Sequence, residues 1–287
     1  MDADERKRRL RLIAQRRAQG IQAGRRKVAQ LPQPDAIRAS YARALTDWLA
    51  PLGAHVTARL VALIPPDSEP EAKADAKAGG GKRSMSAELK ELEKAFGRQL
   101  DREVGKLEAV AKKAATRVDD FHRQAFAEQV RNAVGVKLPA RIGGKAVEQV
   151  VTGFVRENVD LIKTIAPDYF AQLTKVVAEN EHRAETMAKL IAERFDVAQS
   201  RANLIARDQI GKLYGQINQA RQVAAGVTRF IWRTSGDERV RSEHADLDGE
   251  SFEWDSPPAE GIPGQAINCR CGAEADFSEV AAAAVAA

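Results

Sequence analysis

Residues 204–235 read LIARDQIGKLYGQINQARQVAAGVTRFIWRTS, and the change of periodicity inside this stretch decides the fold class. Before Gly226, apolar residues recur at steps of three and four, which is typical of one face of an α-helix. This apolar stripe comprises Ile210, Leu213, Tyr214, Ile217, Ala220 and Ala224. Gly226 is placed to end the helix as a C-terminal cap, and residues 228–233 then predict a short strand. We therefore expect a mainly α protein with a small C-terminal β-and-loop subdomain.

A helical body is expected over residues 85–225, built from long helices. Its first helix covers residues 86–134, where apolar side chains recur at three- and four-residue steps and define one buried face. Asp196 and Gln199 have the spacing of a capping box, so we expect the last helix of the body to begin there. Helices of this kind bury their apolar faces against one another, and the expected architecture is an extended helical body.

The chain before this body comprises a helical segment and a linker. Residues 35–64 have helical periodicity, and Pro51 is expected to bend or divide the helix because proline removes a backbone hydrogen bond. Residues 65–84, PPDSEPEAKADAKAGGGKRS, are rich in Pro, Gly and charge and predict a flexible linker. A segment of this composition buries too little apolar surface to offset the entropy that is lost on ordering.

Residues 1–34 form a basic N-terminal arm. Residues 1–30 carry ten Lys or Arg against three Asp or Glu, whereas residues 230–287 carry four against twelve. Opposite charges at the two ends indicate different partners; double-stranded DNA suits the arm, and a solvated basic helix is the alternative interpretation. Aromatic residues make up only 5% of the chain, which favours phosphate contacts over base stacking. The candidate DNA contacts are Arg6, Lys7, Arg8, Arg9, Arg11, Arg16, Arg17, Arg25, Arg26 and Lys27.

Composition argues against two other classes of protein. No uninterrupted apolar run approaches the roughly 18 residues of a membrane-spanning helix, so no membrane span is expected. Two cysteines in 287 residues are too few for a disulfide-stapled secreted scaffold. The N-terminal sequence MDADERKRRLRL also lacks the apolar core of a signal peptide, and we expect the protein to be made in the cytoplasm.

Residues 226–278 predict a small acidic cap of strands and loops. Asp248-Gly249 is a turn signal between two short segments, and residues 267–271, INCRC, are expected to form a last strand. The cap has few large apolar residues, so it needs a source of stability besides its core. The Ala-rich residues 279–287 predict a frayed or disordered tail.

The only two cysteines of the protein, Cys269 and Cys271, lie in this cap. On a strand, residues two apart project from the same face, and a disulfide between them would close a strained ring. With His244 and one carboxylate, the two thiolates would instead complete a four-ligand structural zinc site. The candidate carboxylates are Asp237, Asp246 and Asp248. Two other interpretations remain open: cysteines that are simply buried, or a nucleophile–base pair of Cys269 and His244.

The C-terminal sequence resembles the phage Mu protein F-like family of head-morphogenesis, or minor capsid, proteins. The shared elements are the helix around Arg207, WRTS at 232–235, Asp237-x-Arg239-x-Arg241, His244, the Gly249 turn and NCRC at 268–271. The resemblance covers about residues 145–275. One departure is Arg207-Asp208-Gln209, where the family usually has Arg-Thr-Glu or a similar sequence, which leaves the role of that acidic position open.

This resemblance implies a non-enzymatic structural protein of the virion of a tailed phage or prophage, made in the bacterial host cytoplasm. Its implied partners are the portal protein, the major capsid protein, or both. The resemblance also implies a zinc ligand set of Asp237, His244, Cys269 and Cys271. Arg239 and Arg241 are expected to pair with acids of the cap. The alternative function is a sequence-nonspecific DNA-binding protein that acts outside the virion.

Overall fold

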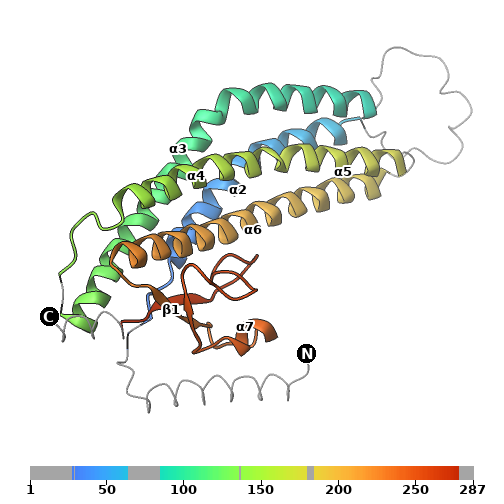
Figure 1. Cartoon of the computed structure of the whole chain (residues 1–287). Coiled ribbons are helices and arrows are strands. Elements are labelled where there is room, and N and C mark those ends of the chain that lie inside the picture. The colour runs from blue at the N-terminus through green and yellow to red at the C-terminus, as the bar shows by residue number, and fades with distance from the viewer. Residues whose placement is uncertain (1–27, 29, 64–84, 136, 180–183, 278–287) are drawn as a thin grey trace, which may run out of the picture. The chain divides into compact units, whose positions relative to one another are not determined.

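The computed structural model describes residues 28, 30–63, 85–135, 137–179 and 184–277 of the chain. It is mainly helical with a small antiparallel sheet near the C-terminus, so the expected fold class is confirmed (Figure 1). The elements are α2 (Asp35–Val61), α3 (Met85–Val134), α4 (Gly144–Lys163), α5 (Ile165–Glu179), α6 (Ala184–Ala224), β1 (Arg229–Arg233), α7 (Ser242–Asp246), β2 (Ser251–Glu253) and β3 (Gly272–Ala275). Within these ranges, no helix has both the length and the apolar character needed to cross a membrane.

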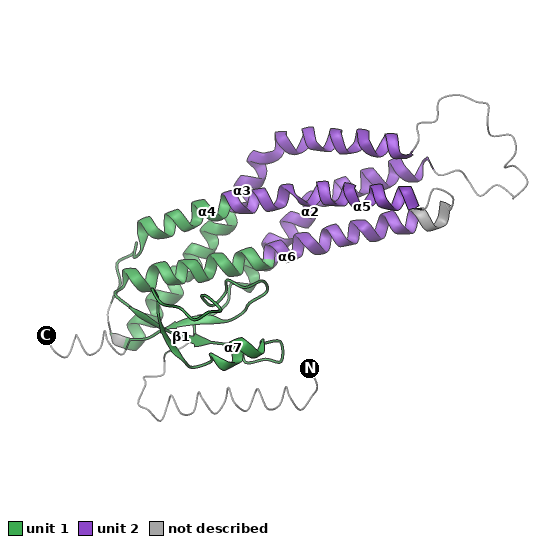
Figure 2. Cartoon of the chain, turned by 45° about the vertical axis from the view of Figure 1, so that its right-hand side comes forward, with its two compact units in different colours: residues 1–38, 112–155, 207–287 green, residues 39–111, 156–206 purple. Residues whose placement is uncertain are grey.

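The residues divide into two compact units, neither of which is a single stretch of chain (Figure 2). Unit 1 comprises residues 1–38, 112–155 and 207–287, and unit 2 comprises residues 39–111 and 156–206. Helices α2, α3, α4 and α6 contribute to both units, because each of these helices runs through a unit boundary. The expected linker over 65–84 and the expected tail over 279–287 lie outside the described residues.

Unit 2 is built from helices around an aliphatic and aromatic core. Helix α2 buries one face at steps of three and four, formed by Tyr41, Leu45, Leu49, Leu52, Val56 and Leu60. Pro51 lies inside α2 without dividing it, since the helix continues to Val61. Gly53 allows a close approach of Phe195, because a Cβ atom at Gly53 would lie 2.2 Å from the Phe195 ring.

Helix α6 runs without a break from Ala184 to Ala224, so the helix start expected at Asp196 and Gln199 was a wrong prediction. Buried Ile191, Ala198 and Ala202 continue one apolar face through that position, and tertiary packing overrides the local capping signal. The helix ends before Gly226, whose φ of 77° is a left-handed conformation that glycine adopts without strain. The C-terminal cap predicted at Gly226 is therefore confirmed.

The cap is organised around β1, the central strand of an antiparallel sheet with strand order β2-β1-β3. Phe230 of β1 lies opposite Phe252 of β2 and Ala275 of β3. The core of the cap consists of Phe230, Trp232, Trp254, Cys271 and Ala273. The strand expected over 228–233 is confirmed, but the strand expected over 267–271 is wrong, because this segment turns and β3 begins only at Gly272.

A second apolar cluster joins the cap to helix α3 within unit 1. It consists of Phe126 and Val130 of α3 with Val227, Ala275 and Phe277. Val28 and Leu31 pack against this cluster, and the hydroxyl of Tyr214 on α6 donates a 2.7 Å hydrogen bond to the carbonyl of Pro32. The cap therefore has packing partners on α3 and in the segment that precedes α2.

Candidate metal centre

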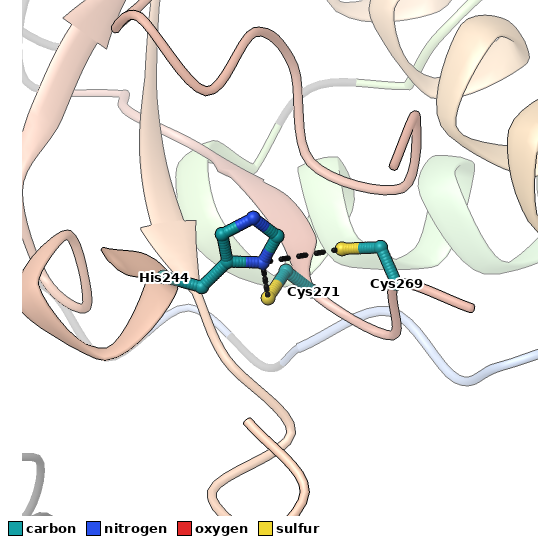
Figure 3. A group of neighbouring side chains, drawn as sticks. All are labelled: His244, Cys269 and Cys271. Atoms are coloured by element: carbon teal, nitrogen blue, oxygen red, sulfur yellow. Dashed lines mark hydrogen bonds between the residues drawn. The ribbon is translucent and has the colours of Figure 1, made fainter. Parts of the chain in front are cut away.

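His244, Cys269 and Cys271 come together in the cap (Figure 3). The imidazole Nδ1 lies 3.6 Å from the Cys269 sulfur and 3.5 Å from the Cys271 sulfur. All three donor atoms lie within 4.8 Å of one another. One nitrogen that faces two sulfurs is an arrangement of metal ligands, whereas a nucleophile–base pair would need only one sulfur.

The spacing of these atoms suits a tetrahedral zinc ion. Zn–S bonds of about 2.3 Å and Zn–N bonds of about 2.0–2.1 Å place a nitrogen and a sulfur about 3.6 Å apart at the tetrahedral angle. The two observed N···S distances, 3.6 and 3.5 Å, agree with this separation. His244 and Cys271 are buried and Cys269 is half-buried, so packing holds the three side chains in place. Two sulfurs and one imidazole nitrogen are also donors that zinc prefers.

His244 is positioned by α7, a five-residue helix that follows the extended residue Arg241. The imidazole packs edge-on against Trp232 of β1, with ring centroids 5.1 Å apart. Arg241 donates a 2.7 Å hydrogen bond to the carbonyl of Ile267, so its partner is a backbone oxygen rather than the acidic side chain expected. This contact joins the loop before His244 to the loop before Cys269, and it helps to set the distance between the ligands.

The surroundings of Cys269 stabilise a thiolate. A hydrogen bond from the Cys271 side chain and backbone N–H bonds from Cys271 and Gly264 lower the pKa of Cys269 to about 5, although burial opposes them. Sharing a proton with Cys269, together with burial, raises the pKa of Cys271. These surroundings therefore favour a thiolate at Cys269, which in turn favours the binding of a cation.

The indole N–H of Trp232 lies close enough to the Cys271 thiol to influence its pKa. This buried N–H has no hydrogen-bond partner among the described residues. A buried donor without an acceptor is unfavourable, and a metal-bound thiolate at Cys271 would satisfy it. The donor set and its surroundings thus fit a metal–thiolate centre.

Gly215 of α6 and Gly264 of the following loop allow the loop to approach the helix closely. A Cβ atom at Gly215 would lie 2.9 Å from the carbonyl oxygen of Pro263, and one at Gly264 would lie 3.4 Å from that of Gly211. A larger residue at Gly215 would move the loop whose N–H bonds the Cys269 sulfur. No sequence pattern indicated these two glycines, because their contact joins residues 49 positions apart in the chain.

Asp208 on α6 supports the turn before the cysteines. Asn268 adopts a left-handed φ of 58°, and its backbone N–H donates a 3.2 Å hydrogen bond to the Asp208 carboxylate. The same carboxylate pairs with Lys212 at 2.8 Å. Asp208 belongs to the Arg-Asp-Gln stretch that departs from the resemblance, and here its role is to hold the turn.

Asp237 does not join the group of metal-ligating atoms. Its carboxylate forms a bidentate pair with Arg270, with both N–O distances at 2.6 Å, and accepts a 2.9 Å bond from the N–H of Arg239. Burial would raise the pKa of Asp237, but the hydrogen bonds from Arg270 and Arg239 lower it. Since Arg270 lies between the two cysteines, the role of Asp237 in the structure is to position the Cys-Arg-Cys segment.

The other two candidate carboxylates also lie outside the group. Asp248 is fully buried and accepts hydrogen bonds from the N–H of Thr234 at 2.7 Å and from its hydroxyl at 2.9 Å. Asp246 lies at the exposed end of α7. The structure therefore brings together three of the four implied ligands. The ten candidate DNA contacts between Arg6 and Lys27 lie outside the described residues.

Comparison with known proteins identifies the part of the chain that carries this centre. Residues 172–274 match the model of the family described as Phage Mu protein F like protein. These residues belong to the phage Mu F-like family. The F-like segment begins in α5 and ends in β3, so it includes all of α6 and His244, Cys269 and Cys271. The resemblance drawn from the sequence is confirmed over these residues.

A second comparison extends the similarity beyond these residues. An uncharacterized protein of Haemophilus influenzae is 33% identical over 193 residues, which is 66% of this chain. The chain spans 42% of the length of that relative. No solved structure has a significant similarity to this chain.

Proposed function

We propose that this protein is a non-enzymatic head-morphogenesis protein, a minor capsid component of a tailed phage or prophage that associates with the portal vertex. The observation that carries the proposal is the F-like match over residues 172–274. In this proposal the helical body binds the portal or major capsid protein, and the cap is a folded docking module. The protein would then be found in the virion after synthesis in the host cytoplasm.

Within this proposal the cap contains one structural zinc ion, held by His244, Cys269 and Cys271. Zinc would supply the stability that a small core does not, because metal binding contributes directly to the folding of such modules. Three protein donors leave one tetrahedral position for an oxygen donor. Asp237 could fill it only by leaving Arg270, to which it is bound at 2.6 Å, so we assign the position to solvent.

Quantitative mass spectrometry of purified proheads and filled heads from producing cells tests the proposed location. A few copies per head in both particles would support a portal-associated minor capsid protein. Presence in proheads alone would instead indicate an assembly factor that leaves before maturation. Absence from every particle would contradict the proposal.

Double-stranded DNA is a second proposed partner, because residues 1–30 carry ten basic against three acidic residues. Deletion of residues 1–30 should weaken DNA binding and flatten its dependence on salt, whereas deletion of residues 279–287 should change neither. Equal binding by both truncated proteins would remove DNA from the list of partners. Tight DNA binding combined with absence from particles would favour the alternative, a DNA-binding protein that acts outside the virion.

A further inference from the structure

A buried hydrogen-bond network links helices α3 and α6 to the strand that directly follows the metal ligand Cys271. We propose that Asn218 and Gln222 of α6 are positioning residues of the metal centre, so that metal binding and the packing of the helix pair in unit 1 stabilise each other. This inference rests on the proposed zinc site. The residues involved, on α6 and β3, lie outside the segments that carry His244 and Cys269.

The contact between α6 and the strand is made at a single carbonyl group. The oxygen of Ala273 accepts hydrogen bonds from Asn218 Nδ2 at 2.8 Å and from Gln222 Nε2 at 2.9 Å. Ala273 lies in β3, two residues after Cys271, and β3 is an edge strand of the sheet. The two amides therefore hold the open edge of the strand that follows the ligand.

His122 and Gln222 fix the orientation of the Asn218 amide through its oxygen. Its Oδ1 lies 3.1 Å from His122 Nε2 of α3 and accepts a 3.0 Å bond from Gln222. His122 Nδ1 accepts a 3.1 Å bond from Arg221, so the ring proton lies on Nε2 and is donated to Asn218. Arg221 is in turn held by an ion pair with Asp119 of α3. With Oδ1 occupied by donors, Nδ2 of Asn218 can only face the Ala273 carbonyl.

The burial of this network makes each contact energetically important. His122 and Gln222 are fully buried, and the exposed fractions of Asn218 and Arg221 are 4% and 2%. Loss of one member would leave buried donors or acceptors unpaired, which is unfavourable in a region of low dielectric. The network therefore holds β3 in one position relative to α6.

A fixed β3 matters for the metal because ligand geometry tolerates little displacement. A zinc site requires ligand distances within about 0.2 Å of their ordinary values. Any displacement of Ala273 is transmitted along two residues of backbone to Cys271 and changes its distance from His244. Residues that orient metal ligands from outside typically contribute about 10–100-fold to metal affinity. Thermodynamic linkage then requires that the metal stabilise the network by the same factor.

The test compares the full-length wild type with three full-length variants. Asn218→Ala and Gln222→Met remove one donor each, and Asn203→Ala removes an exposed asparagine from the same helix as a matched control. The zinc dissociation constant is measured by chelator competition, and the free energy of unfolding is measured with and without zinc. We expect Asn218→Ala to weaken zinc binding about 10–100-fold and Asn203→Ala to leave it unchanged. Cobalt-substituted Gln222→Met should retain the absorption of two bound thiolates, but at a higher midpoint of cobalt concentration.

Amide hydrogen exchange provides a second measurement of the coupling between zinc binding and the packing of α6. Zinc should slow exchange of the α6 amides near residues 218–222 in the wild type, and slow it less in Asn218→Ala. The inference would be overturned if Asn218→Ala and Gln222→Met bound zinc as tightly as the wild type and lost the same free energy of unfolding with and without zinc. The network would then be purely structural. If Asn218→Ala does not fold, Gln222→Met decides by the same criterion. A wild type that binds no zinc would instead refute the proposed metal site, and the two failures are therefore distinguishable.

Discussion

The guanidinium of Arg270 holds the carboxylate of Asp237 in a bidentate pair, with both N–O distances at 2.6 Å. The pair joins the segment that follows β1 to the residue between the two cysteines. It is partly exposed, at 34% for the arginine side chain and 39% for the aspartate. Its contribution to global stability is therefore expected to be small, while its effect on the orientation of the two thiols is direct.

The first prediction concerns this pair. Asp237→Asn should retain one zinc ion per chain, bind it several-fold more weakly, and change the free energy of unfolding by no more than about 1 kcal/mol. Metal analysis together with chelator competition provides the measurement. Complete loss of zinc from Asp237→Asn, with the fold intact, would show that Asp237 is a ligand after all.

The second prediction concerns the ligands themselves. Cys269→Ser should release about one zinc ion per chain and unfold the cap, because its small core is stabilised by the metal. The indole rings of Trp232 and Trp254 lie in that core, so tryptophan fluorescence should report the change. His244→Asn should behave in the same way, and His55→Asn on the exposed surface of α2 serves as its matched control. A zinc-free wild type with an ordered cap would contradict this prediction.

The third prediction uses two glycines in helices. Gly215→Ala places a Cβ atom 2.9 Å from the carbonyl oxygen of Pro263, whereas nothing lies within 4 Å of a Cβ atom at Gly105 in α3. Gly105→Ala should therefore stabilise the protein by about 0.5–1 kcal/mol. Gly215→Ala should destabilise it by about 1–3 kcal/mol and weaken zinc binding, because the loop that contacts Cys269 must move. Urea denaturation of the two variants measures the difference, and equal stabilisation by both would show that the loop yields freely.

The fourth prediction is a dependence of stability on pH. Burial, followed by the charge of Arg221, lowers the pKa of His122 to about 3 from an ordinary value of 6.5. Between these values the unfolded chain binds a proton at this histidine and the folded protein does not. The free energy of unfolding should therefore fall as the pH is lowered from 6.5 towards 3, by up to about 1.4 kcal/mol per pH unit from this group.

Urea denaturation of the zinc-loaded protein between pH 4 and 7, compared with the same measurement on His122→Gln, isolates this contribution. His122→Gln cannot take up the proton, so its stability should depend less steeply on pH over the same range. Equal slopes for the two proteins would mean that His122 does not control the acid sensitivity. The zinc ligands also bind protons, but they are the same in both proteins, so their titration cancels in the difference between the two slopes.

Periodicity was sufficient to predict most of the helices and the first strand. The long apolar stripes of α3 and α6 and the cap at Gly226 depend on local spacing, which a sequence displays directly. The last strand was missed because residues 272–275, Gly-Ala-Glu-Ala, have low strand propensity. This segment becomes a strand through its pairing with β1, where Ala273 lies opposite Trp232.

The candidate metal centre could be predicted in part. The spacing of the two cysteines and the presence of His244 indicated the three residues that the structure brings together. Asp237 was included as a ligand because the family resemblance implied it. Its carboxylate is instead paired with Arg270, which lies 33 residues away in the chain. The contact of Asn218 with Ala273 spans 55 residues and involves a backbone carbonyl, which no sequence pattern identifies.

The sequence separations in unit 1 have a consequence for the order in which the molecule assembles. His244 and Cys269 are 25 residues apart, whereas His122 and Asn218 are 96 residues apart. Closing the shorter loop has an entropic advantage of about 1 kcal/mol, since the closure entropy grows with the logarithm of loop length. The ligand loop can thus close as a local event before distant helices find each other. Ribosomal synthesis produces α3 well before the cap, so the contacts of His122 with α6 can form only after the chain has been made through residue 221.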